Sequence, residues 1–338
     1  MHLRGINYGH VIASSGTRGF FDEGYTYHKL PIWKGGAEHL KQATFVAKTV
    51  TLHENVGNMP LTWTYQPRDF MPKCIVVKPF EGAVLNAVGL SNFGIKAMLA
   101  DKRWQERTDN FFISFMCLQK TAPLRLAELR TFVTFLIKEL PNFKGKVALE
   151  INYSCPNVGL HQDELVSEVT KGLEIASVLN IPLVPNFNAL LPVEAAIAIA
   201  QHEACDAVSI ANSIPWGAVP DLINWEGIFG SKTSPLAHLG GGGLSGAPIL
   251  NVTLGWLQDL NTRRYTFAKP LVVGGGILSA ADAELVLKGG YPSVRAIKLG
   301  VVALLRPWNI KGILRGADAV FHKPGLSAPP APLKHQAS

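Results

Sequence analysis

Long apolar runs are missing from this sequence, although 47% of its 338 residues are hydrophobic. No stretch reaches the roughly eighteen apolar residues that a membrane-spanning helix needs. The first residues, Met1 to Gly5, also lack the apolar core of a signal peptide. The sequence therefore predicts a cytoplasmic protein with no transmembrane segment.

Cysteine is scarce and scattered: the four residues are Cys74, Cys117, Cys155 and Cys205. No two of them are spaced as the ligands of a zinc site or an iron–sulfur cluster would be, so we expect no metal centre. The pattern fits a reducing compartment. We expect Cys117 and Cys205 to be small apolar residues of the core, and Cys74 to lie in a loop.

A strong basic segment is also absent. The formal net charge is +7, but the Lys and Arg residues are dispersed along the chain. No basic run or arginine–aromatic interleaving predicts a nucleic-acid partner. A cationic surface serves anionic small molecules equally well, so we expect a small-molecule substrate.

Short apolar runs alternate with helical stretches, which is typical of a parallel sheet. The expected strands are Val11–Ala13, Thr44–Thr49, Phe111–Cys117, Val147–Tyr153, Pro182–Asn186, Ala207–Ala211, Leu271–Val273 and Ala296–Leu299. The expected helices are Asn92–Arg107, Pro123–Leu140, Asp163–Leu179, Pro192–His202, Ile249–Leu260, Ala280–Lys288 and Pro307–Leu314. Eight strands alternating with helices predict an α/β fold, the (β/α)8 TIM barrel. We expect one domain over residues 1–320, with an excursion at about 51–80 and a disordered tail at 321–338.

Polar residues gather where the expected strands end. Lys48 ends the second strand, and Asn152, Cys155 and Asn157 follow the fourth. The carboxyl ends of barrel strands hold the active site in this fold. Asparagine offers one acceptor and two donors, which suits a flat heterocycle with alternating C=O and N–H groups. The duller interpretation of Cys155 is a buried cysteine in a turn.

Glycines follow the last two strands. Gly274–Gly276 and Gly300 let backbone N–H groups approach an anion closely, which predicts a phosphate site. The run Gly240–Gly246 has two interpretations: backbone that passes over a cofactor, or a flexible loop.

With these motifs the chain resembles the dihydroorotate dehydrogenase family, the FMN enzymes of pyrimidine biosynthesis. The matching segments are Ala13–Thr17, Ala47–Leu52, Gly57–Pro60, Asn86–Gly94, Asn152–Asn157, Gly242–Gly246, Val273–Ile277 and Leu299–Gly300. The most specific is Asn-x-Ser-Cys-Pro-Asn. Cysteine in that motif resembles the soluble branch of the family.

The resemblance implies oxidation of dihydroorotate to orotate, with a proton going from C5 to Cys155 and a hydride going from C6 to flavin N5. Lys48 would lie near both flavin and substrate. The implied substrate-binding set is Lys48, Asn86, Val88, Gly89, Leu90, Asn152, Asn157, Asn212 and Ser213. The implied FMN-binding set is Ser14, Ser15, Gly16, Lys48, Thr49, Asn86, Asn152, Asn186, Gly242, Gly243, Gly275, Gly276, Gly300 and Val301. A homodimer is also implied.

One departure from the family pattern concerns the fifth strand, where Asn186 stands in place of a lysine beside flavin N1 and O2. A positive charge there stabilises the anionic reduced flavin. Lys298 on the last strand could supply it, although a lysine facing solvent or a helix is the commoner case.

Several alternatives stay open. His161 could serve as the base, although a solvent-exposed loop histidine is the commoner case. Trp216 could cover the flavin or simply pack. The chain could act on another dihydropyrimidine, or bind flavin with reduced turnover. The electron acceptor could be fumarate, NAD through a partner subunit, or quinone.

Overall fold

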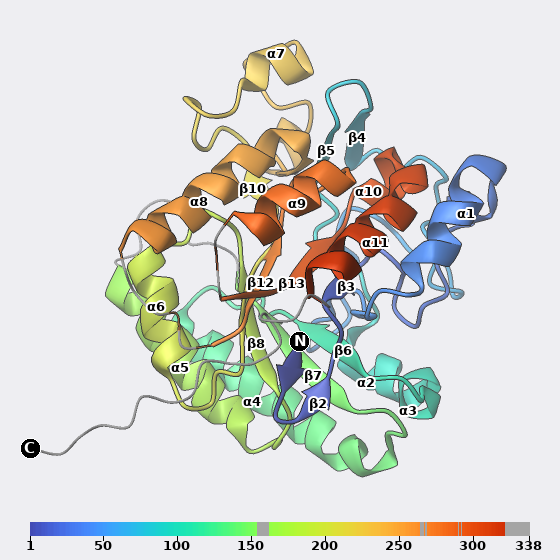
Figure 1. Ribbon diagram of the computed structural model, residues 1–338. Helices are drawn as coiled ribbons and strands as arrows, with labels where there is room; N and C mark the ends of the chain where they lie inside the picture. The colour runs from blue at the N-terminus through green and yellow to red at the C-terminus, as the bar shows by residue number, and fades with distance from the viewer. Residues whose placement is uncertain (154–161, 264–266, 268, 290, 292, 322–338) are drawn as a thin grey trace, which may run out of the picture.

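The computed structural model describes residues 1–153, 162–263, 267, 269–289, 291 and 293–321. Its centre is a parallel sheet of seven named strands in the order β3-β13-β12-β9-β8-β7-β6 (Figure 1). Their bounds are β3 Val11–Ala13, β13 Val294–Leu299, β12 Leu271–Gly274, β9 Val208–Ile210, β8 Leu183–Phe187, β7 Val147–Asn152 and β6 Phe111–Phe115. Each strand pairs in parallel with its neighbours in this order.

The second expected strand closes the barrel without forming a continuous ladder. Thr44 bridges to Ile12 on one side, and Val46 bridges to Phe112 on the other, both in parallel. This segment therefore fills the gap between β3 and β6. The expected (β/α)8 architecture is confirmed, while the Thr44–Thr49 strand consists of isolated bridges.

Helices surround the barrel (Figure 1). Their bounds are α1 Pro31–Leu40, α2 Gly94–Ala100, α3 Arg103–Glu106, α4 Ala122–Glu139, α5 Gln162–Ser177, α6 Val193–Gln201, α7 Trp225–Phe229, α8 Leu250–Thr262, α9 Ala280–Lys288, α10 Val302–Leu305 and α11 Ile310–Phe321. The expected helix Asn92–Arg107 is in fact two helices, because Lys102 between them has a left-handed backbone with φ 70°. The last helix runs on to Phe321, well beyond the expected end at Leu314.

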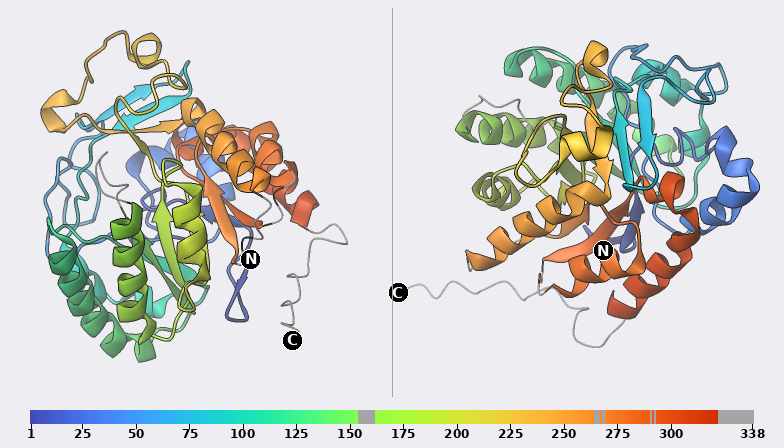
Figure 2. Two further views of the ribbon diagram at one scale, coloured as in Figure 1. Left: turned by 90° about the vertical axis from the view of Figure 1, so that its left-hand side faces the viewer. Right: turned by 90° about the horizontal axis from the view of Figure 1, so that it is seen from above.

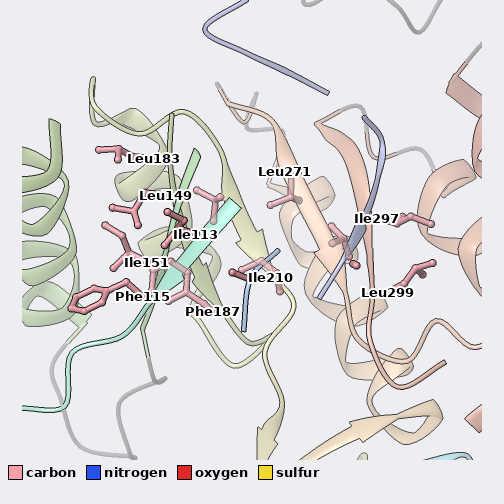
Figure 3. Close-up of a cluster of buried hydrophobic side chains, with 14 of the residues drawn as sticks. Ile113, Phe115, Leu149, Ile151, Leu183, Phe187, Ile210, Leu271, Ile297 and Leu299 are labelled. Atoms are coloured by element: carbon pink, nitrogen blue, oxygen red, sulfur yellow. The ribbon is translucent and has the colours of Figure 1, made fainter. Parts of the chain in front are cut away.

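The outer face of the barrel is apolar. Side chains alternate along a strand, so residues such as Leu149 and Ile297 point away from the axis and pack in the large core against the helices. Figure 3 shows several of these side chains on neighbouring strands.

The inner face changes character along the barrel. At the amino ends of the strands it is apolar, and Ala148 and Ala296 belong to a second cluster there. The hairpin of β1 His2–Leu3 and β2 Ile6–Asn7 lies at this end, and Leu3 is part of the same cluster. Two residues further along five of these strands the inward positions become polar and remain buried; they are Ser114, Glu150, Asn186, Ser209 and Lys298.

A smaller antiparallel sheet lies at the other end of the molecule, in the order β10-β11-β5-β4 (Figure 2). Its strands are β4 Ile75–Lys78, β5 Ala83–Asn86, β10 Ile214–Pro215 and β11 Gly243–Gly246. The excursion after the second barrel strand therefore ends in β4. The glycine run Gly240–Gly246 contributes β11 to this sheet, so its end is ordered β structure paired with β5.

Candidate active site

A cavity of about 1080 Å³ opens at the carboxyl ends of the barrel strands, beneath the smaller sheet. Every described residue of the expected substrate and FMN sets lines it. Those residues are Ser14, Ser15, Gly16, Lys48, Thr49, Asn86, Val88, Gly89, Leu90, Asn152, Asn186, Asn212, Ser213, Gly242, Gly243, Gly275, Gly276, Gly300 and Val301. Cys155, Asn157 and His161 lie outside the described residues.

Lys48 is one of the cations that line this cavity, with Arg125 and Lys298. Its side chain is buried, donates to the backbone oxygen of Ser91 at 2.5 Å and lies 4.9 Å from the centre of the Phe20 ring. Burial lowers the pKa of Lys48 to about 8, against the smaller opposing effects of Cys74 and Glu23. A lysine held in this way loses its proton more easily than a solvated one.

Three asparagines form a chain across the cavity floor. The Nδ2 of Asn186 donates to the Oδ1 of Asn152 at 2.5 Å and to the Oδ1 of Asn212 at 2.6 Å. Asn212 in turn donates to the backbone oxygen of Asn186 at 3.2 Å. Both N–H groups of Asn186 are thus used, and its buried Oδ1 has no partner among the described residues.

Hydroxyl groups continue this chain on its other side. The Nδ2 of Asn152 donates to Thr49 Oγ1 and to Ser114 Oγ, each at 2.8 Å. Ser15 Oγ lies 2.8 Å from Thr49 Oγ1 and donates to the backbone oxygen of Ala47. Residues from four strand positions are therefore linked by hydrogen bonds around the floor.

The sequence-based interpretation of Lys298 as a solvent- or helix-facing lysine is wrong. The structure places Lys298 inside the barrel with 3% of its side chain exposed, where it forms an ion pair with the equally buried Glu150. Ser114 donates to the other carboxylate oxygen of Glu150 at 3.0 Å. Lys298 alternates inward from β13 because Ile297 and Leu299 face the helices.

The glycines that follow β12 and β13 lie on the cavity wall. Gly275 and Gly276 have φ of +102° and +85°, and a Cβ on Gly276 would lie 2.6 Å from the Cβ of Leu250. The N–H groups of Gly275, Gly276 and Gly300 donate no hydrogen bond to another described residue. They are therefore available to a ligand oxygen.

Trp216 packs and does not line the cavity: its ring lies 4.7 Å from that of Trp225 and 5.1 Å from that of Phe229, between centroids. Cys117 packs against the large core, as expected, but it is only half-buried. It lies after β6 and also lines the cavity, and its Sγ donates to the backbone oxygen of Arg125 at 3.2 Å. Cys74 and Cys205 are both buried.

Some lining residues were not identified from the sequence. Tyr25 and Tyr27 lie between β3 and α1, and Arg125 and Glu168 form an ion pair across α4 and α5. Tyr25 donates to the backbone oxygen of Gly16 at 2.5 Å. No motif marks these positions, because they reach the cavity only through the folding of their loops and helices.

Fold and site together define a class: a (β/α)8 barrel with a polar cavity at the carboxyl ends of its strands, which is the usual position of an active site in this fold. Among the described residues, no cluster of His, Cys, Asp or Glu could hold a metal ion. Within the same part of the chain, no helix has the length and apolarity needed to cross a membrane.

The chain belongs to the dihydroorotate dehydrogenase family, whose model matches residues 34–296. Curated relatives of the chain carry the name dihydroorotate dehydrogenase B (NAD(+)), catalytic subunit. The one from Endomicrobium trichonymphae is 27% identical and covers 94% of this chain and 90% of its own. The one from Thermodesulfovibrio yellowstonii is 27% identical, with 90% and 88% covered. The one from Caldicellulosiruptor saccharolyticus is 29% identical, with 94% and 92% covered.

Proposed function

We propose that this protein is an FMN-dependent oxidoreductase that converts dihydroorotate to orotate. The observation that carries the proposal is the cavity, where Lys48, the asparagine chain and the glycine loops meet at one end of a barrel of this family. A cation suits a carboxylate, carboxamides suit a cyclic imide, and free backbone N–H groups suit a phosphate.

The described residues fit FMN. Gly275, Gly276 and Gly300 have N–H groups that donate to no other residue in the described ranges, and these groups suit its phosphate. Asn186 and Asn212 offer an acceptor beside a donor, because the described part of the chain supplies no partner for the Oδ1 of Asn186 or for the second N–H of Asn212. That pattern complements the N–H and C=O edge of a flavin or a pyrimidine. FMN, when bound, would supply hydride acceptance from C6 of the substrate.

Cys155 is the proposed base for the proton at C5 of dihydroorotate; this assignment comes from the sequence motif. A free thiol has a pKa of about 8.5, so the rate should rise with pH unless the site lowers that value. Lys48 would bind the substrate carboxylate, and Asn86, Asn152 and Asn212 would orient the ring. Asn157 belongs to the same proposed set.

A second subunit is the proposed partner. The relatives are named as catalytic subunits of an NAD(+)-linked enzyme, which favours a separate NAD-handling subunit over fumarate or quinone as acceptor. It also favours assembly with a different chain over the homodimer that the family resemblance implies. Co-purification from a cell that expresses a candidate partner gene beside this one would test the assembly.

Anaerobic addition of dihydroorotate to the purified, FMN-loaded protein tests the function. We expect the visible absorbance of oxidised flavin to bleach. Dihydrouracil is the matched control ligand, because it has the same ring without the carboxylate that Lys48 would bind. Bleaching by dihydrouracil alone would contradict the proposal and indicate another dihydropyrimidine substrate.

A flavin-binding homologue with reduced turnover is the second candidate. The observation that favours it is Asn186, a neutral residue at the position where the family resemblance implies a lysine. In that case FMN would bind and neither dihydropyrimidine would bleach it.

A further inference from the structure

The polar layer beneath the cavity contains a buried ion pair. Lys298 and Glu150 contact each other from opposite parts of the barrel, and each has 3% of its side chain exposed. Glu150 does not line the cavity, whereas Lys298 reaches its floor. A pair as deeply buried as this costs desolvation and is weak evidence for stability by itself. Its contacts indicate another role.

In its ion pair with Lys298, Glu150 is a carboxylate, and a carboxylate can only accept hydrogen bonds. The hydroxyl of Ser114, 3.0 Å from Glu150 Oε1, must therefore donate to it. Ser114 has one hydrogen, so its oxygen can only accept from its other neighbours. One of these is the Nδ2 of Asn152 at 2.8 Å. The charge on Glu150 thus decides which end of the Asn152 amide faces Ser114.

The donor-to-acceptor direction that is set at Ser114 continues through the three hydrogen-bonded asparagines. With its Nδ2 committed to Thr49 and Ser114, Asn152 turns its Oδ1 to the Nδ2 of Asn186. Asn186 then donates its second N–H to the Oδ1 of Asn212. An acceptor on Asn186 and a donor on Asn212 then have no partner among the described residues. Reversal of one amide would leave two donors or two acceptors face to face.

We infer that Lys298 is a positioning residue: through Glu150 and Ser114 it fixes the amide orientation of Asn152, Asn186 and Asn212, and so sets the donor and acceptor pattern that the cavity presents to a ring. The inference rests on the proposed function only in taking that ring to be the flavin of FMN.

Loss of the Lys298 cation should remove this constraint on the orientation of the three asparagine amides. Without Lys298, the buried carboxyl of Glu150 loses the partner that holds one of its two oxygens. Its contact with the Ser114 hydroxyl is then no longer held in one direction, and both amide orientations of Asn152 become available. Arginine would keep the positive charge beside Glu150, so Lys298→Arg should preserve the orientation.

The test compares Lys298→Met, Lys298→Arg and the double variant Lys298→Met/Glu150→Met with the wild type. Replacement of a buried pair by apolar residues of similar size is often neutral or stabilising, so the double variant separates folding from orientation. We expect the double variant to keep a cooperative thermal unfolding transition near that of the wild type. We expect its FMN dissociation constant to rise by about tenfold or more, the effect of losing one directed hydrogen bond.

The absorption spectrum of the bound flavin gives a second readout, because it responds to the hydrogen bonds on the ring. We expect Lys298→Met and the double variant to share a shifted spectrum, and Lys298→Arg to match the wild type. A double variant with the wild-type dissociation constant and spectrum would overturn the inference and leave the pair a purely structural element.

If the wild type binds no FMN, the proposed function fails and a flavin-free measurement decides the inference. Side-chain NH2 signals of protein labelled with 15N at asparagine report the amide orientations directly. We expect slowly exchanging, single signals for the buried chain in the wild type and broadened or doubled signals in the double variant. Identical signals in both proteins would overturn the inference.

Discussion

The surroundings of Lys48 favour the loss of its proton. Burial lowers its pKa to about 8, whereas an unfolded chain keeps a lysine pKa near 10.4. Between these values the unfolded chain binds more protons than the folded protein, so the free energy of unfolding should rise with pH. The Lys48→Met variant should lack this pH-dependent rise in the free energy of unfolding, which amounts to up to about 3 kcal/mol.

Urea unfolding of the ligand-free protein from pH 7.5 to pH 10 measures this slope. Lys171→Met is the matched control, because Lys171 is an exposed lysine on α5. If the free energy of unfolding rises equally with pH in Lys48→Met and in the wild type, the lowered pKa of Lys48 does not contribute to the pH dependence of stability.

Cys155 is the second residue with a prediction of its own. Cys155→Ala should slow flavin reduction by dihydroorotate at least about a hundredfold at neutral pH, the lower end of the effect of losing a general base. Cys205→Ala is the control: that cysteine is fully buried away from the cavity, and burial raises its pKa to about 12. Stopped-flow absorbance of the flavin gives both rates. An unaltered rate in Cys155→Ala would remove this thiol from the mechanism.

Among the elements, the loop between β12 and α9 depends on its glycines. Gly276 has φ of +85°, and an added Cβ would lie 2.7 Å from the backbone nitrogen of Leu250. Gly276→Ala should therefore displace the loop and weaken FMN binding by at least about tenfold, because free backbone N–H groups would move away from the phosphate.

Gly255→Ala provides the contrast on the neighbouring helix α8. Gly255 is exposed, and an added Cβ would meet nothing within 4 Å. This change should raise the free energy of unfolding by about 0.5–1 kcal/mol, because alanine is the better helix former, and should leave FMN binding unchanged. Isothermal titration and thermal unfolding of both variants separate the two outcomes.

At the scale of the whole molecule, a ligand held by several strands should stabilise the entire barrel. FMN at a hundred times its dissociation constant should add about 2.7 kcal/mol to the free energy of unfolding by mass action. Riboflavin, which lacks the phosphate, should give a smaller shift at equal concentration. Thermal unfolding with each compound measures the difference. Equal shifts would show that the glycine loops do not bind the phosphate.

The sequence by itself determined the order of strands and helices, because apolar periodicity follows from local geometry. It also brought Lys48, the asparagines and the glycines to the strand ends, and all the described ones line a single cavity. Side chains alternate along a strand, so the outward position of Leu149 implies that Glu150 points into the barrel. The inward position of Glu150 could therefore also be predicted from the sequence.

Only the tertiary structure decided what these residues contact. Lys298 meets Glu150 across 148 positions of sequence, and no local pattern encodes a pair formed by barrel closure. The β11 strand likewise depends on β5, since the run Gly240–Gly246 has little strand preference of its own. Local alternation along each strand therefore determines which side chains face the barrel axis, and the closed barrel decides which of them share a hydrogen bond.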